Sequence, residues 1–246
     1  CIGYNMGIVE DVTVRNVKVS GDARVGGLAG GTMQPMRRIT AEGTLTKDGD
    51  SYSSEYLVRG REIIGGILGS GNLTEDISAA GIKVLGTNEI AGKGKNIAYI
   101  GGAIGSGSFT IPGQSTGENK EKESKVADIF VTAENAYPDT PNTIQYLGGV
   151  AGSGGQNYII AENVEVRCSQ ASYVGGIAGS GYVSYGIVRT AGKDETVSYQ
   201  IPKTVVECLE FAGGAAGTGG MGNGVVEGIQ VTALKSNAGG VAGING

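Results

Sequence analysis

A glycine doublet recurs along this chain, and it limits what the chain can fold into. The phrase reads VGGLAGG from Val25, IGGILGSG from Ile64, IGGAIGSG from Ile100, LGGVAGSG from Leu147, YVGGIAGSG from Tyr173, AGGAAGTG from Ala212 and AGGVAGING from Ala238. The doublets themselves are Gly26 and Gly27, Gly65 and Gly66, Gly101 and Gly102, Gly148 and Gly149, Gly175 and Gly176, Gly213 and Gly214, and Gly239 and Gly240. Their first glycines are 39, 36, 47, 27, 38 and 26 residues apart. Such a period is typical of a repeat array, with a bare unit of about 26 residues and inserts in the longer units.

A second phrase lies between the doublets and predicts a β-strand. Apolar and polar residues alternate with the period of two that strands require. A short polar residue, at Asp11, Asp76, Asp128 or Asn163, comes just before the apolar positions and is expected at the strand entrance. The copies are VEDVTV from Val9, TEDISA from Thr74, VADIFV from Val126, AENVEV from Ala161 and VEGIQV from Val226.

The doublets are interpreted as structural corners. Glycine accepts positive φ and allows another backbone to come close, and each glycine disfavours a helix by up to about 1 kcal/mol relative to alanine. A phosphate-binding loop is the alternative, but no Lys-Ser or Lys-Thr pair follows the doublets. We therefore predict an all-β fold, an elongated parallel β-solenoid that forms one domain over residues 1–246. We expect it to be right-handed, with about seven or eight rungs and inserted loops.

Composition and charge exclude several classes of function. The net charge is −5, whereas nucleic-acid binding calls for a basic surface. No apolar run approaches the roughly 18 residues that a membrane-spanning helix needs, so no membrane span is expected. The chain has 39% hydrophobic residues, which is too many for a disordered low-complexity sequence.

Catalytic and metal-binding patterns are not found in the sequence. There is no histidine to serve as a general base or metal ligand. Cys168 and Cys208 are in phase with core residues, so we expect two buried free thiols on adjacent rungs. The recurrent acids are expected on a solvated edge rather than in an acid pair; they are Glu10, Glu75, Glu162 and Glu227. We predict no catalytic residue, no metal site, no cofactor and no enzymatic activity.

The inserts are the expected positions of recognition, because loops that leave a rigid scaffold commonly carry binding residues. Tyrosines in them could stack on sugars or anchor a protein partner; solvated loop filler is the alternative. The candidates are Tyr52, Tyr56, Tyr137 and Tyr199. The expected inserts are Thr46–Glu62, Thr87–Asn96, Phe109–Ser124, Tyr137–Gln145 and Thr190–Lys203.

The repeat unit resembles the GLUG motif, a glycine-rich repeat of bacterial surface adhesins and of metallopeptidases that cleave immunoglobulin A. The first unit carries the resemblance best, in CIGYNMGIVEDVTVRNVKV from Cys1 followed by VGGLAG. In the family pattern a glycine doublet would directly precede Cys1. The chain is accordingly expected to be a fragment of a longer array. A lipidated N-terminal Cys1 is the less favoured alternative.

The resemblance implies an extracellular or bacterial cell-surface protein. It favours a non-catalytic structural or adhesive module whose inserts recognise a host or cell-surface protein or glycan, and whose ends meet adjacent repeats or domains of the same polypeptide. The alternative is a scaffold or substrate-selecting region of a large surface enzyme such as the immunoglobulin-cleaving metallopeptidases. The zinc signature of those peptidases needs histidine, and this chain has none.

Overall fold

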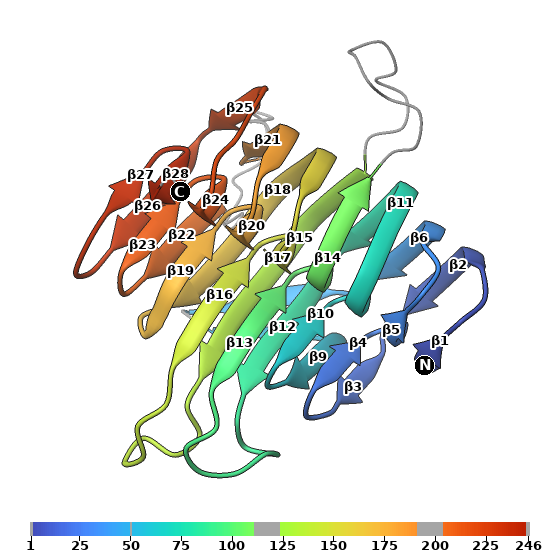
Figure 1. Cartoon of the computed structure of the whole chain (residues 1–246), viewed down its shortest axis with the longest axis horizontal. Coiled ribbons are helices and arrows are strands. Elements are labelled where there is room, and N and C mark those ends of the chain that lie inside the picture. The colour runs from blue at the N-terminus through green and yellow to red at the C-terminus, as the bar shows by residue number, and fades with distance from the viewer. Residues whose placement is uncertain (1, 50, 111–123, 191–203, 245–246) are drawn as a thin grey trace.

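The computed structural model describes residues 2–49, 51–110, 124–190 and 204–244, and within these ranges the chain forms strands and no helix. The prediction of an all-β chain with parallel strands is confirmed. Figure 1 shows the strands stacked side by side in chain order, with the N-terminus at one end of the stack and the described C-terminal strands at the other. No helix suited to crossing a membrane occurs among the described residues.

The strands fall into four columns, which the chain visits in the same order again and again. The first column holds β1 (Ile2–Asn5), β5 (Ala29–Thr32), the start of β11 (Leu68–Ala80), the start of β14 (Ile104–Thr110), β17 (Ala151–Ser153), β20 (Ala178–Ser180), β24 (Ala216–Thr218) and β28 (Ala242–Ile244). The second holds β2 (Val9–Arg15), β6 (Met36–Glu42), the ends of β11 and β14, the start of β15 (Ser124–Glu134), the start and middle of β18 (Gln156–Cys168), β21 (Val183–Arg189) and β25 (Gly224–Glu227).

The third column holds β3 (Lys18–Ser20), β9 (Tyr56–Gly60), β12 (Ile82–Thr87), the ends of β15 and β18, β22 (Thr204–Cys208) and β26 (Ile229–Ala233). The fourth holds β4 (Arg24–Gly26), β10 (Ile63–Gly65), β13 (Ile97–Gly101), β16 (Ile144–Gly148), β19 (Ala171–Gly175), β23 (Phe211–Gly213) and β27 (Ala238–Gly239). The first three columns form one 19-stranded sheet and the fourth a separate 7-stranded sheet. We call one pass through the four columns a rung; the described residues contain seven rungs and the strand β28 of a further one.

Pairing between rungs is parallel and in register. In the fourth column Ile64 pairs with Ile100, Ile100 with Leu147, and Leu147 with Val174. The one antiparallel pair among the described strands is a hairpin of β7 (Leu45–Asp48) and β8 (Ser51–Ser54). Each inward side chain therefore stacks on the equivalent residue of the next rung, about 4.8 Å away.

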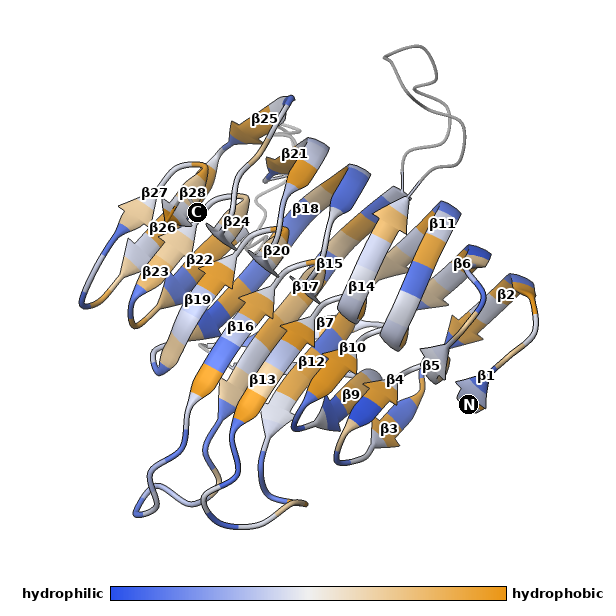
Figure 2. Cartoon of the chain, in the orientation of Figure 1, coloured by the Kyte–Doolittle hydropathy of each residue, from blue (hydrophilic) through white to orange (hydrophobic). Residues whose placement is uncertain are grey.

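The core is a set of stacked aliphatic rows enclosed by the columns. Its buried residues form one cluster that runs from Val9 in the first rung to Ala215, at the corner that leads into β24. Ile64, Ile100, Leu147 and Val174 form one such row and are all fully buried. Figure 2 shows apolar colours along these strands and polar colours in the two loops that project below β12, β13 and β16. Burial of the rows supplies the main stabilisation of the stack.

The glycine doublets are corners where two backbones come too close for a side chain. A Cβ on Gly175 would overlap the carbonyl oxygen of Ala178, three residues later in the same turn. A Cβ on Gly176 would overlap the carbonyl oxygen of Gly214, the second doublet glycine of the next rung. The first glycine thus permits the tight turn and the second permits the stacking. Both recur in the other doublets, except that Gly240 has open space around it.

Positive φ belongs to a different glycine from the one we expected. None of the doublet glycines lies in the positive-φ region, so close approach alone explains them. In five of the phrases the glycine that follows the serine or threonine does, as in Gly107 with φ of 145° and Gly181 with φ of 133°. These glycines turn the chain at the end of the first column.

The second sequence phrase occupies two different places in the rung, which corrects our alignment of its copies. Val12 and Ile77 each pair with Ile39, in the second column. Ile129 pairs with Val164 at the start of the third column, one corner further along. Both corners use a residue with positive φ, which is why they resemble each other in sequence: Asp11 (57°) and Asp76 (53°) at the first, Asp128 (52°) and Asn163 (51°) at the second.

The role of the doublet can be tested with one added methyl group. Gly176→Ala should destabilise the chain by roughly 1–3 kcal/mol, because the Cβ meets backbone that cannot move without shifting the next rung. Gly155→Ala is the matched control, since Gly155 is exposed and its Cβ would have no neighbour closer than 3.9 Å. Thermal unfolding should show a loss of several degrees for the first variant only. Equal melting temperatures would mean that the doublet is not a packing constraint.

Cys168 and Cys208 are register partners on adjacent rungs, and both are buried free thiols, as predicted. Burial raises the pKa of Cys168 and raises that of Cys208 from 9.0 to about 12. Side chains in a parallel register point the same way, which opposes disulfide formation although the strands are neighbours.

Both thiols should react with a thiol reagent such as DTNB at pH 8 only after unfolding.

The burial of Cys208 should also make the stability of the chain depend on pH. Because the unfolded thiol ionises near pH 9 and the folded Cys208 does not, the stabilisation contributed by the neutral Cys208 thiol should be lost as the pH rises from about 9 through 12. Chemical denaturation measured from pH 9 to pH 12 should show that the unfolding free energy falls less steeply with pH in the variant Cys168→Ala/Cys208→Ala than in the parent chain. Rapid reaction of both thiols in the folded protein would contradict the burial.

Candidate functional site

An aromatic ladder lies on the fourth column, half-buried on its outer side. The rings of Tyr99, Tyr146, Tyr173 and Phe211 stack with centroids 5.3, 5.1 and 5.2 Å apart and interplanar angles of 3°, 15° and 11°. We did not predict this ladder, although the sequence holds its signal. An aromatic residue stands two positions before the doublet in YIGG, YLGG, YVGG and FAGG.

The geometry of the ladder limits what it can bind. Each inner ring is covered on both faces by its neighbours, so the ladder presents ring edges rather than open faces. A sugar that stacks on an aromatic face would therefore find no face on Tyr146 or Tyr173. The ladder instead adds offset-stacking energy of about 0.5–1.5 kcal/mol per pair along the column.

Two long loops project at the corner between the third and fourth columns, and we call residues 88–96 and 135–143 the loop edge. They leave adjacent rungs, after β12 and β15, and Figure 1 shows them side by side at the foot of the stack. Asn88 joins them. Its Nδ2 donates to the Lys95 carbonyl (3.2 Å) and to Asn135 Oδ1 (2.9 Å), and its Oδ1 accepts from the Ala136 N–H (2.9 Å).

Further amide contacts hold the second loop in a fixed shape. Asn135 Nδ2 donates to the carbonyl oxygens of Tyr137 (3.0 Å) and Thr140 (3.1 Å). Between the loops, the Thr143 N–H donates to Asn96 Oδ1 (3.0 Å). Asn88 has no exposed surface, so its amide is a structural group and is not available to a ligand.

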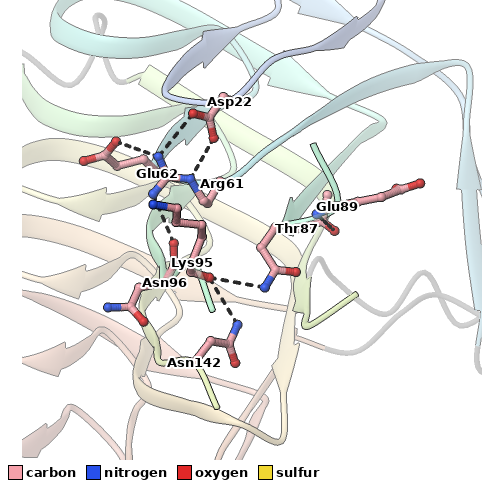
Figure 3. A network of polar contacts seen from close by, with 9 residues as sticks. Asp22, Arg61, Glu62, Thr87, Glu89, Lys95, Asn96 and Asn142 are labelled. Carbon is pink, nitrogen blue, oxygen red and sulfur yellow. Dashed lines mark hydrogen bonds and ion pairs between the residues drawn. The ribbon is translucent and has the colours of Figure 1, made fainter. Parts of the chain in front are cut away.

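A charged group anchors the first loop to the earlier rungs. Arg61 Nε donates to Asp22 Oδ1 (2.7 Å) and Arg61 Nη1 donates to the Asn96 carbonyl (3.4 Å). The guanidinium also holds the pKa of the Asp22 carboxyl below its usual range. Figure 3 shows this chain of contacts running from Asp22 through Arg61 to the loop that carries Lys95 and Asn96. The loop edge is thus fixed by hydrogen bonds at its base.

A cleft of about 390 Å³ lies below the second loop. The next rung has only Ser169 and Gln170 at this corner, so the surface steps down from a long loop to a tight turn. One wall comes from the 135–143 loop, through Pro138, Thr140, Pro141 and Asn142 among others. The floor and far side come from Ile144, Ser169, Gln170, Leu209 and Lys235. The cleft is within the size range of small-ligand sites.

Two of the predicted binding tyrosines are buried, which corrects that expectation. Tyr56 has no exposed surface, and its hydroxyl donates to the Gly66 carbonyl (2.9 Å). It belongs to β9, a strand of the third column, so Thr46–Glu62 is not wholly an insert. Tyr52 is 4% exposed. Phe109, which we placed at the start of another insert, is buried in β14.

Tyr52 fixes the hairpin β7–β8 against the outer side of the third column. Its ring stacks on Phe130 with centroids 4.3 Å apart, and its hydroxyl donates to the carboxylate of Glu165. Lys83 Nζ donates to the Tyr52 carbonyl oxygen (2.7 Å), and Lys47 Nζ lies 3.7 Å from Glu165 Oε2. The hairpin therefore covers three successive rungs and is packed in place rather than displayed for recognition.

Tyr137 is the one predicted tyrosine that the structure places in a projecting loop. Its hydroxyl donates to the Glu89 carbonyl oxygen (3.2 Å), so it also ties the two loops together. Tyr199 lies outside the described residues, as do most of the expected inserts Phe109–Ser124 and Thr190–Lys203.

Two of the recurrent acids, Glu10 and Glu162, pair with basic residues of neighbouring rungs, and Glu162 is buried, which corrects the expectation of a solvated edge for it. Glu10 accepts from Arg37 Nε (2.5 Å) and Arg38 Nη2 (2.8 Å), and these bonds lower its pKa. Glu162 lies between Lys125 (2.6 Å) and Arg189 (2.5 Å). These pairs alternate charge along the stack. Within the described ranges, no group of three or more acids or cysteines is placed to hold a metal ion.

Comparisons of the chain with models of known protein families, with curated proteins and with solved structures found no match.

The loop edge can be tested through Asn88. Asn88→Ala removes three hydrogen bonds and leaves the Ala136 N–H without its partner, so the two loops should separate from each other. Amide hydrogen exchange should become at least about tenfold faster in 88–96 and 135–143, as a loss of 1.4 kcal/mol or more in local stability implies. Strands β13 and β16 should keep their protection. Unchanged exchange in the loops would show that they are held by other contacts.

Proposed function

We propose that this chain is a section of a right-handed parallel β-solenoid whose role is structural and adhesive rather than catalytic. The in-register parallel pairing over seven rungs supports the fold. The repeated glycine corners support its identification with GLUG-type repeats of bacterial surface proteins. In this proposal the chain is extracellular or attached to the cell surface, and adjacent repeats of the same polypeptide extend the stack.

The carrying observation is the contrast between the stack and the loop edge. Most corners between the third and fourth columns are tight, whereas two adjacent rungs carry loops that buried amides hold in a fixed shape. Ordering such a loop during folding costs conformational entropy. A surface that is already ordered then loses less conformational entropy when it binds a partner, which favours association. The loop edge is the proposed recognition surface for a host or cell-surface protein or glycan.

The alternative role, as the scaffold or substrate-selecting part of a large surface enzyme, uses the same surface. It differs in what is joined to the module. The binding experiment below applies to both roles, and a chain extended beyond residues 1–246 would separate them by the presence or absence of a zinc-peptidase domain.

The test compares the whole chain with a variant whose loops are replaced by the tight turn of the next rung. Residues 87–96 and 134–143 are each exchanged for Ser-Gln, the dipeptide that joins β18 to β19 as Ser169 and Gln170. Both loops are removed together, so neither leaves the other's amides unpaired. The fluorescently labelled chain should bind mucin or epithelial cells, and the variant should lose most of that binding.

The variant must remain folded for the result to count, and the tight turn is native to this stack. Its far-UV spectrum should be unchanged and its melting temperature should fall by no more than a few degrees. Asn72→Ala/Ser108→Ala is the control, because this exposed hydrogen-bonded pair lies at the corner between the first and second columns, away from the loop edge. Equal binding by the chain and the loop variant would refute the loop edge as the recognition surface.

A further inference from the structure

The cleft below the 135–143 loop has unused hydrogen-bonding groups. The side chains of Ser169 and Gln170 are exposed and make no hydrogen bond to other described residues. Asn142 Nδ2 makes one long contact, 3.5 Å to the Lys95 carbonyl. A hydroxyl and two amides offer donors and acceptors close together. That combination suits a ligand rich in hydroxyl groups, each of which both donates and accepts.

The charge of the cleft is positive and comes from one residue. Lys235 is exposed and makes no ion pair within the described part of the chain. Among the described residues that line the cleft there is no carboxylate. An anionic group on the ligand would therefore find a cation without a competing acid. A single lysine is too little for a nucleic acid, whose binding depends on many phosphate contacts.

Part of the remaining lining is apolar. Pro138 and Pro141 are exposed on the loop side, and Ile144 and Leu209 contribute to the floor. Such surfaces pack against the C–H faces of a sugar ring, a contact that the covered ring faces of the aromatic ladder do not provide. The lining residues span four successive rungs, a distance of about 14 Å. The ligand that fits is elongated along the stack.

The backbone around the cleft disfavours an extended peptide. A peptide that binds by strand addition needs free N–H and C=O groups on a sheet edge. Here these groups are used between rungs: the Leu209 N–H donates to the Ala171 carbonyl (2.9 Å) and the Lys235 N–H to the Leu209 carbonyl (2.7 Å). Recognition at this corner must come from side chains.

We infer that this cleft binds an acidic oligosaccharide. The hydroxyl groups of the sugar would hydrogen-bond to Ser169, Gln170 and Asn142, and its carboxylate would pair with the ammonium group of Lys235. The inference rests on the proposed function, because it names the ligand class of the loop edge. The inference adds which residues would bind the sugar hydroxyl groups and which one would bind the carboxylate.

The experiment titrates the whole chain with matched probes by NMR or calorimetry. The acidic probes are 3′-sialyllactose and trigalacturonate, the neutral probe is lactose, and triglutamate represents an acidic peptide. Both acidic sugars should bind more tightly than lactose. Lys235→Met should weaken them by about five- to tenfold, the usual effect of losing a hydrogen bond to a charged group, and should leave lactose within twofold. Gln170→Ala should weaken acidic and neutral sugars alike.

Lys18→Met is the control variant, since Lys18 is an exposed lysine of β3 on the first rung. It should bind all probes like the parent. No binding of either acidic sugar at millimolar concentration would overturn the inference, and so would binding that both cleft variants leave unchanged. Triglutamate binding as tight as that of the sugars would assign the cleft to acidic peptides instead. Loss of cell binding in the loop-exchange variant without sugar binding would refute this inference and leave the proposed function standing.

Discussion

The structure depends on the distance between stacked backbones at the glycine corners. Because the rungs are parallel and in register, the second glycine of each doublet lies against the carbonyl oxygen of the second doublet glycine in the next rung. Gly176, for example, lies against the carbonyl oxygen of Gly214. No side chain fits in that space. Because every rung has the same corner, the rungs hydrogen-bond continuously and their aliphatic rows meet in register. The doublet sets the spacing that the core and the surface rows inherit.

Stacking also explains why surface features appear as rows. Once positions align between rungs, a residue type repeated in sequence becomes a ladder in space, as in the stacked rings from Tyr99 to Phe211. Opposite charges face each other on neighbouring strands of the second column, since like charges directly opposite each other would repel. Glu162 between Lys125 and Arg189 is the clearest case. The rows are interrupted at the loop edge, where two adjacent rungs carry long loops in place of tight turns.

The sequence was informative where the physical constraint is local or strictly periodic. The doublets predicted corners, the alternating phrases predicted strands, and the phase of Cys168 and Cys208 placed both thiols inside and side by side. It misled where two corners share one local conformation. Asp76 and Asp128 both have positive φ before an apolar strand, yet they lie at different corners. Copies of the first corner without a short polar residue, at Arg38, Tyr158 and Tyr185, were overlooked because positive φ there is not confined to such residues.

The candidate site was decided by tertiary structure. In the sequence, Tyr52 and Tyr56 cannot be told from tyrosines of an exposed loop. Both are buried, because of the strand to which each belongs and the residues that pack over it. The cleft exists because a long loop in one rung stands beside the tight turn at Ser169 and Gln170 in the next, a relation that sequence distance hides. The sequence by itself determined the repeated corner, the strand character and the inward rows, since these follow from sterics and periodicity within one unit. Only the stack decided the rest, because register between rungs places residues tens of positions apart against one another.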